Sequence, residues 1–408
     1  MTGRADEVEI DALGARGDGI VELPEGPIFI PYALPGERWR VKEGEPSVLL
    51  RPHPARAKPV CRHFGSCGGC VAQHMPEDMY VAWKRAIMVD AFRHRGIDAP
   101  LEPLVRIPPA SRRRVTLYAR RYRKELYVGF YRAATHYILN VEECPVASPA
   151  IVRLLPVLRE MLDPVLSGKA EAAISMLATP GGVDVAISFI HVGPLRQQYP
   201  RMAALAVRHG IARLTVEDDR VAQTHETMLT FGGVDVEPPP RSFVQAVAQS
   251  EEAMIRLVTG AAGKARRIAD LFCGIGTFTF PLARQARVTA VDSREDAVAA
   301  LAGAARRSQG LKPIETRVRD LFRTPLSAQE LTGFDAVVLD PARSGAQKQA
   351  EQIARSRVPA VIYVSCEPGT LARDARTLLD GGYGLERVTP IDQFLYADHV
   401  EAVSVLRR

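Results

Sequence analysis

Long apolar runs are missing from this sequence of 408 residues, and its first residues contain no apolar signal core. A membrane-spanning helix needs about 20 consecutive apolar residues, and a secretory signal needs an apolar core of roughly 7 to 15. We therefore expect a cytoplasmic protein without membrane segments. Hydrophobic residues still make up 47% of the chain, which is enough for two or three folded domains.

Cysteines and aromatic residues are few, and an acidic excess is absent. The chain has six cysteines and an aromatic content of 6%. Disulfides are rare in a reducing compartment, so we expect the cysteines to be free, catalytic or bound to a metal. The 53 Lys and Arg residues against 47 Asp and Glu residues give a net charge of +6, which suits an anionic partner without identifying one.

Four of the cysteines form a pattern typical of a metal centre. Three are clustered, and the distant fourth is followed by Pro145, as in ferredoxin motifs. We predict that these cysteines hold a [4Fe–4S] cluster: Cys61, Cys67, Cys70 and Cys144. Structural zinc is the alternative, although zinc sites more often pair two short CxxC units. His63 and His74 are alternative ligands.

A basic segment over residues 104–142 has the composition of an RNA-binding surface, and its pattern predicts a β-meander. Up to position 132, nine Lys or Arg residues stand against the single acidic residue Glu125. Five aromatic residues interleave with them: Tyr118, Tyr122, Tyr127, Phe130 and Tyr131. Arginines contact phosphates and aromatic rings stack on bases, so we predict a surface for single-stranded RNA. A solvated strand face is the alternative.

From about residue 238 onward, strand and helix patterns alternate, which predicts an α/β fold with a doubly wound sheet. Two of its predicted strands end in an acid, Asp292 and Asp340. The predicted strands cover residues 268–272, 287–292, 334–340, 358–365 and 399–406.

The first of these strands is followed by glycines that allow a ligand close to the backbone. Gly274 opens a Gly-Ile-Gly turn, and Asp292 lies 22 residues past Asp270, where an acid can bind both hydroxyls of a ribose. Thr279 replaces the third glycine of a dinucleotide fingerprint. This favours a nucleoside cofactor without a pyrophosphate, S-adenosylmethionine, over NAD. The alternative is a glycine turn kept for packing.

Cys366 comes one residue after the apolar run Val361–Val364, which predicts a buried strand, and Pro368 and Gly369 then turn the chain into a helical stretch over residues 370–379. Ligands gather at the carboxyl ends of strands in an open α/β sheet. A thiolate there is a strong nucleophile. The alternative is a small buried apolar residue, the commoner role of a free cysteine.

Four motifs occur in an order that resembles the RNA uracil-C5 methyltransferases: Asp270–Phe278, Asp340–Arg343, Ser365–Pro368 and His399–Glu401. With the four cysteines, the chain resembles the iron–sulfur members that modify 23S ribosomal RNA. Residues 17–37 resemble a TRAM domain, an OB-like RNA-binding barrel. The resemblance implies a TRAM-like barrel at 1–52, a central domain with the iron–sulfur site and the basic meander at 53–237, and a class I methyltransferase domain at 238–408.

The resemblance also implies a mechanism. Cys366 adds to C6 of a uridine, C5 takes the methyl group, and Glu401 removes the C5 proton. Asp340 contacts the uracil, which leaves its base stack, or orients the surroundings of the nucleophile. The cofactor contacts that the resemblance implies are Gln245, Phe272, Gly274, Asp292, Asp320 and Asp340.

The expected partner is RNA, with 23S rRNA favoured over tRNA, and the expected state is a monomer away from membranes. Glu367 stands where the family has asparagine, and its charge would oppose ionisation of the neighbouring Cys366. Two other functions stay open from the sequence: a cytosine-C5 methyltransferase, and a non-catalytic RNA-binding protein with a methyltransferase fold.

Overall fold

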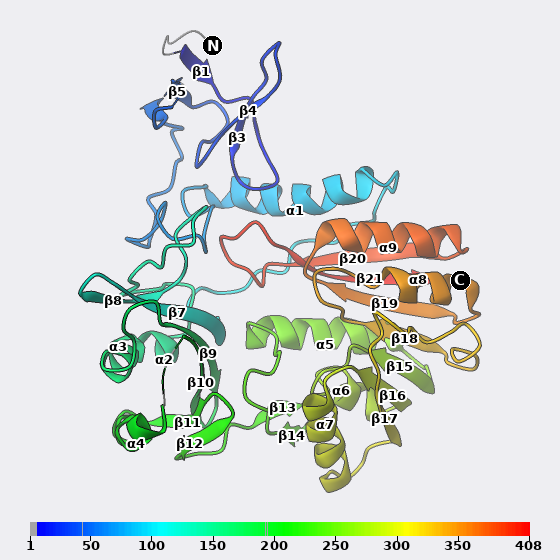
Figure 1. Cartoon of the computed structure of the whole chain (residues 1–408). Coiled ribbons are helices and arrows are strands. Elements are labelled where there is room, and N and C mark those ends of the chain that lie inside the picture. The colour runs from blue at the N-terminus through cyan, green and yellow to red at the C-terminus, as the bar shows by residue number, and fades with distance from the viewer. Residues whose placement is uncertain (1–5, 43, 192, 194) are drawn as a thin grey trace.

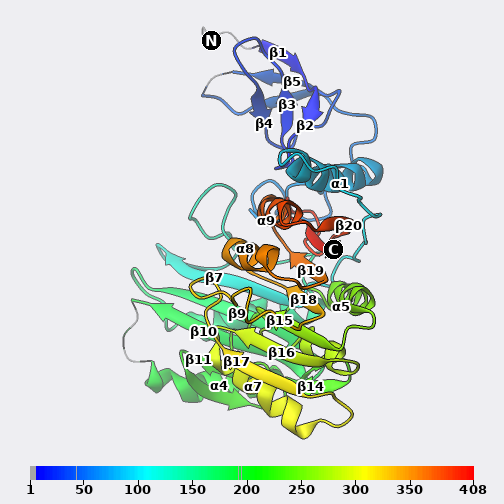
Figure 2. The same cartoon turned by 90° about the vertical axis from the view of Figure 1, so that its right-hand side faces the viewer.

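The structure is a computed structural model that describes residues 6–42, 44–191, 193 and 195–408. Its strands form an N-terminal pair of small sheets, a central six-stranded sheet and a C-terminal seven-stranded sheet (Figures 1 and 2). In the described residues, no helix is long and apolar enough to cross a membrane.

The N-terminal part consists of two antiparallel three-stranded sheets. Its strands are β1 (Asp6–Glu9), β2 (Ala12–Leu13), β3 (Gly19–Val21), β4 (Ile28–Ile30), β5 (Arg38–Val41) and β6 (Val48–Arg51). The sheets have the orders β1-β5-β6 and β2-β3-β4 around a small apolar core. Gly19 is required here, because a Cβ atom would lie 2.7 Å from Ala33 Cβ. The buried Glu37 accepts hydrogen bonds from Trp39 and from Arg56 of the following linker.

The amphipathic pattern of residues 80–95 predicts a helix after the cysteine cluster, and the structure has α1 (Glu77–Arg93) there. It packs against α9 (Pro368–Asp380), and its buried residues join the core of the C-terminal sheet (Figure 1). Tyr80, Trp83 and Met88 are among these buried residues. Helix α1 therefore connects the cysteine loop directly to the last elements of the chain.

The central sheet is mixed and is covered by helices on one face. Its strands are β7 (Arg114–Tyr122), β8 (Glu125–Gly129), β9 (Glu171–Thr179), β10 (Gly182–Ile190), β11 (Ile211–Val216) and β12 (Asp219–Gln223), in the order β12-β11-β10-β9-β7-β8. Its helical segments are α2 (Pro149–Val152), α3 (Leu155–Leu162), η1 (Arg196–Gln198) and α4 (Tyr199–Arg208). The hairpin of β13 (Leu229–Phe231) and β14 (Val234–Val236) follows.

Two predictions for this region are corrected by the structure. The meander predicted over 104–142 is limited to the hairpin β7–β8, and the chain after Gly129 is held by isolated bridges such as Tyr131 to Ile138. The sequence pattern of residues 150–166 predicts one helix, which the structure divides into α2 and α3. Pro156 lies in the first turn of α3, where a missing N–H is tolerated, so the chain restarts a helix there.

The C-terminal sheet confirms the predicted doubly wound α/β architecture. Its strands are β15 (Arg267–Leu271), β16 (Arg287–Asp292), β17 (Ile314–Val318), β18 (Ala336–Leu339), β19 (Ala360–Ser365), β20 (Gly384–Ile391) and β21 (Glu401–Arg407). Their order is β17-β16-β15-β18-β19-β21-β20. Five strands are parallel, and β21 runs antiparallel to both of its neighbours.

Helices cover both faces of this sheet, which explains its apolar strands. Helices α1, α9 and α8 (Gln347–Arg355) pack on one face, and α5 (Ala248–Ala262), α6 (Thr279–Ala283) and α7 (Glu295–Arg307) pack on the other (Figure 1). Val361 and Tyr363 of β19 point into the first core, whereas Ile362 and Val364 point into the second. A strand buried on both sides needs this continuous apolar run.

Candidate active site

The predicted site residues lie around the carboxyl ends of the parallel strands. Asp340 follows β18, and Cys366 follows β19. Strand β21 runs in the opposite direction, and its register places Ala402 opposite Ser365. Glu401, the first residue of β21, therefore starts at the sheet edge where Cys366 leaves β19.

These residues line one cavity of about 440 Å³. The predicted site residues among its lining are Cys366, Glu401, Asp340, Gln245, Phe272, Gly274 and Asp292. Asp320 is not in this lining. Its carboxylate accepts hydrogen bonds from the backbone of Phe322 at 2.9 Å and Arg323 at 3.1 Å, so it fixes a turn. The ring of Phe322 lines the cavity and lies 5.1 Å from the ring of Phe272.

The glycine turn after β15 has the backbone that a nucleoside pocket requires. Phe272 and Gly274 have φ angles of 63° and 53°, in the left-handed region. The Gly274 N–H donates a hydrogen bond of 2.9 Å to Asp292 Oδ2, which ties the turn to the end of β16. At Gly276, a Cβ atom would lie 2.5 Å from the ring of Phe280, so only glycine fits there.

The surroundings of the Cys366 thiol oppose its ionisation. Burial raises its pKa to about 12, the negative charges of Glu401 and Asp340 act in the same direction, and Arg343 opposes them. The main negative charges beside the thiol thus belong to Glu401 and Asp340 instead of to Glu367. The Glu367 N–H donates to Ser365 Oγ at 3.2 Å, at the start of α9.

Two buried carboxyl groups face the same cavity. Burial raises the pKa of Glu401 to about 8. Burial raises the pKa of Asp340 well above its ordinary value, and the charge of Glu401 adds to this effect. A carboxyl group that titrates near neutral pH is suited to general-base chemistry, whereas one that stays protonated can donate a hydrogen bond.

A chain of side-chain hydrogen bonds joins these two carboxyl groups. Gln245 Nε2 donates to Asp340 Oδ2 at 3.0 Å. Gln393 Nε2 donates to Gln245 Oε1 at 3.0 Å and to Glu401 Oε2 at 2.8 Å. Gln393 and its partner Ser250 were not predicted from the sequence. The only available signal for Gln393 was its position eight residues before Glu401.

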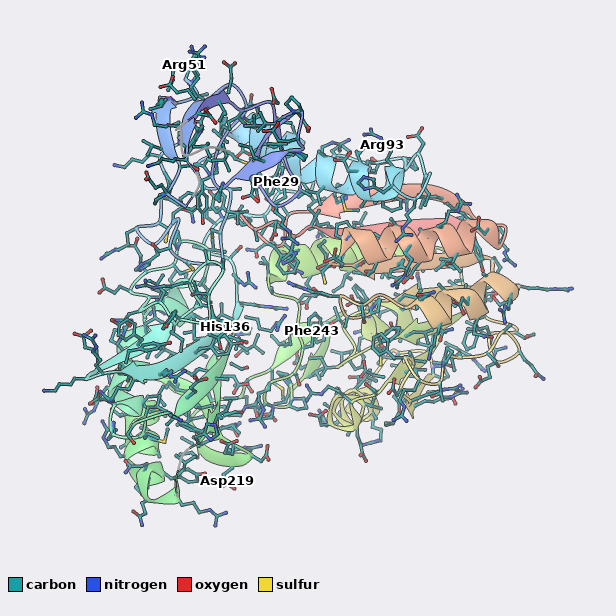
Figure 3. The ribbon with its side chains drawn as sticks, turned by 45° about the horizontal axis from the view of Figure 1, so that its top comes forward. Phe29, Arg51, Arg93, His136, Asp219 and Phe243 are labelled. Carbon is teal, nitrogen blue, oxygen red and sulfur yellow. The ribbon has the colours of Figure 1, made fainter. Side chains whose placement is uncertain are left out.

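Part of the predicted RNA-binding arginine run is instead packed against the active site. Arg112 and Arg114 line the cavity that contains Cys366 and Glu401. The guanidinium of Arg114 lies 4.7 Å from the ring centre of Phe243, and its Nε donates to the carbonyl of Val244 at 2.6 Å. Burial lowers the pKa of Arg114 to about 10. Phe243 is 56% exposed and lies between the central and C-terminal sheets (Figure 3).

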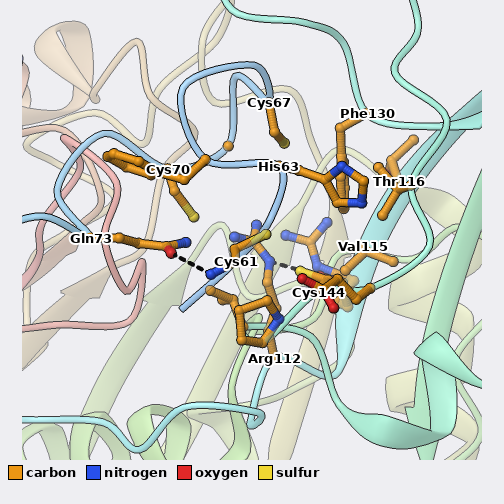
Figure 4. Close-up of a pocket in the computed structure, with 17 residues that line it drawn as sticks. Cys61, His63, Cys67, Cys70, Gln73, Arg112, Val115, Thr116, Phe130 and Cys144 are labelled. Carbon is orange, nitrogen blue, oxygen red and sulfur yellow. Dashed lines mark hydrogen bonds between the residues drawn. The ribbon is translucent and has the colours of Figure 1, made fainter. Parts of the chain in front are cut away.

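The four clustered cysteines line a second cavity of about 300 Å³ (Figure 4). These residues are Cys61, Cys67, Cys70 and Cys144, and all four are free. His63 also lines the cavity, whereas His74 does not and has no hydrogen-bond partner for either ring nitrogen. Within the described ranges, no group of three or more His, Cys, Asp or Glu side chains is arranged to hold a metal ion. Arg112 lines both cavities.

The strand order, the glycine turn and the acid after the second strand define a class I methyltransferase fold, a class that binds S-adenosylmethionine. The chain has the same fold as the tRNA (uracil-54, C5)-methyltransferase of Pyrococcus abyssi, solved with S-adenosyl-L-homocysteine. The TM-score is 0.72 at 21% identity, with 98% of this chain and 100% of the other covered.

Sequence comparison then gives the family. The family model described as tRNA (Uracil-5-)-methyltransferase matches residues 109–408. An uncharacterized RNA methyltransferase of Agrobacterium fabrum is 42% identical over 98% of this chain and 99% of its own. The 23S rRNA (uracil(1939)-C(5))-methyltransferase RlmD of Aeromonas hydrophila is 32% identical over 98% and 96%. The chain belongs to this family and is an S-adenosylmethionine-dependent RNA (uracil-C5)-methyltransferase, so a cytosine-C5 activity is set aside.

Proposed function

We propose that this enzyme methylates C5 of one uridine in 23S rRNA through a covalent bond between Cys366 and C6. The observation that carries the proposal is the cavity that Cys366, Glu401 and Asp340 share with the glycine turn and Asp292. Ribosomal RNA is favoured because the similarity to the 23S rRNA enzyme of Aeromonas hydrophila extends over almost the whole chain. The tRNA enzyme of Pyrococcus abyssi is 21% identical and supports the fold alone.

The Cys366 thiol first loses its proton to solvent, and the thiolate that attacks has Arg343 and Arg114 as the cations beside it. Its Sγ bonds to C6, and the electrons of the C5–C6 double bond move toward the O4 carbonyl. S-adenosylmethionine, when bound, would supply the methyl group to C5. The cofactor would then leave as S-adenosylhomocysteine. Glu401 then takes the C5 proton. The electrons of that C–H bond rebuild the C5–C6 double bond, and the S–C6 pair returns to Cys366.

Asp340 and Gln245 act on the base in this proposal. Burial raises the pKa of Asp340 and so favours its protonated form, whose O–H can donate to a carbonyl oxygen of uracil. Gln245 is hydrogen-bonded to Asp340 and lines the cavity, so both are positioned before the base arrives. Cytosine carries an amino group where uracil carries O4, so a protonated acid at this place favours uracil.

The cofactor contacts stay as the sequence predicted them, with one addition. We assign the ribose hydroxyls to Asp292 and the adenine to Phe272, with Gly274 giving the cofactor close access to the backbone. The predicted contact between Asp320 and the adenine amino group stays a prediction. Phe322, which the turn of Asp320 carries, adds a second ring beside Phe272.

The four clustered cysteines are proposed to hold a [4Fe–4S] cluster, with zinc as the alternative. They line one cavity without forming disulfides, and the cavity of about 300 Å³ is larger than one tetrahedral ion with sulfur ligands at about 2.3 Å needs. The buried cation of Arg112 faces Cys144 and Cys70, which suits a centre with negatively charged ligands. No step of the methyl transfer is assigned to this centre.

The open face of the central sheet is proposed to guide the RNA strand to the cavity. Alternate residues of β7 share this face: Arg114, Thr116, Tyr118, Arg120 and Tyr122. The residues between them pack into the core under α2 and α3. Strand β7 therefore leads from the cavity at Arg114 to a group of tyrosines, where Tyr118 and Tyr131 lie 4.3 Å apart.

The charge of this face is lower than the sequence predicted. Arg120 is paired with Glu171, and Arg121 donates to Asp163 and to backbone carbonyls near α3. Affinity along the strand thus depends more on base stacking than on phosphate contacts. We keep the divisions at residues 52 and 237, and the TRAM-like role of the N-terminal part, as proposals.

The function is tested with labelled S-adenosylmethionine and two purified RNAs that lack the modification, 23S rRNA and total tRNA. The expected product is 5-methyluridine at a single position of 23S rRNA. Label confined to tRNA would overturn the proposed target but keep the reaction, and label on neither RNA would overturn both.

A further inference from the structure

Gln393 is the branch point of the hydrogen bonds behind the catalytic cavity. Its Nε2 has two acceptors, Glu401 Oε2 at 2.8 Å and Gln245 Oε1 at 3.0 Å. Its Oε1 accepts from the hydroxyl of Ser250 at 2.5 Å. All four side chains are buried, with exposed fractions of 2% or less. Each polar group of the amide therefore has a partner, which is a condition for a stable buried amide.

The partners also fix the orientation of the amide. The reverse orientation would place the Gln393 oxygen against the carboxylate of Glu401 and against the oxygen of Gln245. In the orientation observed, the amide presents its N–H groups to Glu401 and Gln245, and its oxygen accepts from the Ser250 hydroxyl, which also donates to the Val247 carbonyl at 2.8 Å.

Two side chains of α1, Tyr80 and Lys84, hold the chain on both sides of Gln393. The Tyr80 hydroxyl donates to the carboxylate of Asp392, whose two oxygens lie 2.8 and 2.9 Å from it, and Asp392 lies 3.1 Å from Lys84 Nζ. The same Lys84 Nζ donates to the carbonyls of Phe394 at 3.0 Å and His399 at 2.7 Å. Lys84 and Asp392 are both fully buried. Helix α1 thus fixes the segment from Asp392 to His399, which leads to Glu401 two residues further on.

We propose that Gln393 is a positioning residue that holds the carboxylate of Glu401 in place to receive the C5 proton and couples it, through Gln245, to Asp340. The proposal rests on the assignment of Glu401 as the base. An N–H donor stabilises the charged form of the carboxylate, which is the form that accepts a proton. Gln393 fixes one oxygen of the Glu401 carboxylate, so the carboxylate meets the uracil ring in one orientation.

The test replaces Gln393 by methionine, which has a similar volume and no N–H donor. Proton removal becomes slow, so the RNA stays bonded to Cys366, and kcat is expected to fall roughly 10- to 100-fold while KM for RNA stays within about threefold. The acidic limb of the pH profile is expected to move up by about one pH unit, because Glu401 loses the donor that lowers its pKa. The readouts are the pH profile and the protein–RNA adduct on a denaturing gel.

Other charged groups face Glu401 and are unchanged in this variant. They are Cys366 after β19, Asp340 after β18, Arg343 in the loop before α8, and Arg112 and Arg114 of the central part. The shift of the pH profile is therefore read as a difference between Gln393→Met and the unaltered enzyme, measured with the same RNA.

Gln349→Met is the matched control. Gln349 is also a buried glutamine with two hydrogen bonds, at 2.8 and 3.0 Å to the backbone of Leu326, but it lies in α8 outside the cavity. It is expected to lower the melting temperature without moving the pH profile or trapping an adduct. If Gln393→Met does not fold, Ser250→Ala takes its place. Ser250→Ala removes one partner of the Gln393 amide but keeps its N–H donors. We therefore expect a smaller shift of the pH profile and less adduct than in Gln393→Met.

Glu401→Gln separates the inference from the assignment beneath it. If Glu401→Gln accumulates the adduct but folded Gln393→Met keeps the pH profile of the unaltered enzyme and forms no adduct, the role of Gln393 is overturned and the proposed function stands. If Glu401→Gln forms no adduct, another residue removes the C5 proton. The assignment of Glu401 and the role of Gln393 are then both overturned.

Discussion

At the scale of single residues, the cavity is defined by two carboxyl groups and a thiol whose pKa values are all raised by burial, and Glu401 raises those of Asp340 and Cys366 further. Asp340 and Glu401 line the same cavity, joined through Gln245 and Gln393, and both oppose ionisation of Cys366. Such an arrangement lowers stability near neutral pH, because the groups cannot all be charged. The raised pKa of Glu401, about 8, places a proton acceptor in the physiological range.

This cost predicts that Glu401→Gln is more stable than the unaltered enzyme at pH 8. The folded pKa of Glu401, about 8, lies above the ordinary value of 4.5, so its favourable contribution is complete below about pH 4.5 and is lost as pH rises to about 8. The neutral amide does not titrate. The melting temperature of Glu401→Gln is expected to exceed that of the unaltered enzyme at pH 8 and to match it near pH 5. Equal melting temperatures at both pH values would contradict the burial of a titrating Glu401.

The site residues that the sequence predicted are those at strand ends. Cys366, Asp340 and Asp292 follow apolar runs, so their position at one edge of the sheet can be read from the pattern. Gln393 and Ser250 could not be predicted, because their contacts depend on how the loop before β21 packs on α1 and α5. The sequence has no period that encodes such a contact between distant segments.

At the scale of elements, strand β7 connects the parts of the site. Its odd-numbered residues, such as Leu117 and Ala119, are buried under the helices of the central sheet. Its even-numbered residues pass from the catalytic cavity to the cysteine cavity, which Thr116 lines, and on to Tyr118. Over the nine residues from Arg114 to Tyr122, which are eight steps of about 3.3 Å, a strand extends about 26 Å. An RNA strand on this face would thus pass both cavities.

The alternation along β7 predicts a stacking surface for RNA. Replacing Tyr118 and Tyr131 together by alanine is expected to weaken binding of the 23S fragment by about 10- to 100-fold, because each stacked base is worth about 1–3 kcal/mol. The measurement is fluorescence anisotropy at one fixed salt concentration. Tyr199→Ala is the control, since Tyr199 packs among the helices under the sheet and bonds to Asp219. Equal loss of affinity in the control would contradict a specific stacking surface.

Elements with a strong period were predicted well, and those set by local breaks were not. Strands β15, β16, β19 and β21 lie within a few residues of their predicted positions, because their apolar runs are continuous. The meander at 104–142 was too long, since alternating polar residues after Gly129 resemble a strand but form a loop around the cysteine cavity. A proline in the first turn of α3 divided one predicted helix into two.

At the scale of the whole molecule, the cysteine loop lies between the parts of the chain. The N–H groups of Val71 and Ala72 donate to the carbonyl of Tyr396, at 2.8 and 3.1 Å, in the segment that leads to Glu401. Gly68 N–H donates to the carbonyl of Tyr131 beside the tyrosines of the central sheet. A metal centre held by this loop would therefore support both the tyrosines of the central sheet and the segment that leads to Glu401.

The assignment of the centre predicts a brown protein after anaerobic purification, with about four iron and four sulfide per chain and absorbance near 400 nm, an approximate expectation for cysteine-bound iron–sulfur clusters. Cys144→Ser is expected to lose most of the iron, because Cys144 is the proposed fourth ligand. Cys273→Ser is the control, since Cys273 is free and buried in the C-terminal part. A colourless protein with one zinc per chain would overturn the iron–sulfur assignment.

The central claim is that Cys366 bonds to C6 of the uridine, and it is tested most directly by trapping that bond. A 23S fragment with 5-fluorouridine at the target position has no C5 proton for Glu401 to remove, so the methylated adduct cannot resolve. With S-adenosylmethionine, the enzyme is expected to give a slowly migrating protein–RNA species on a denaturing gel, and mass analysis is expected to place the RNA on the peptide that contains Cys366. Attachment to another residue, or methyl transfer that persists in Cys366→Ala, would contradict the account.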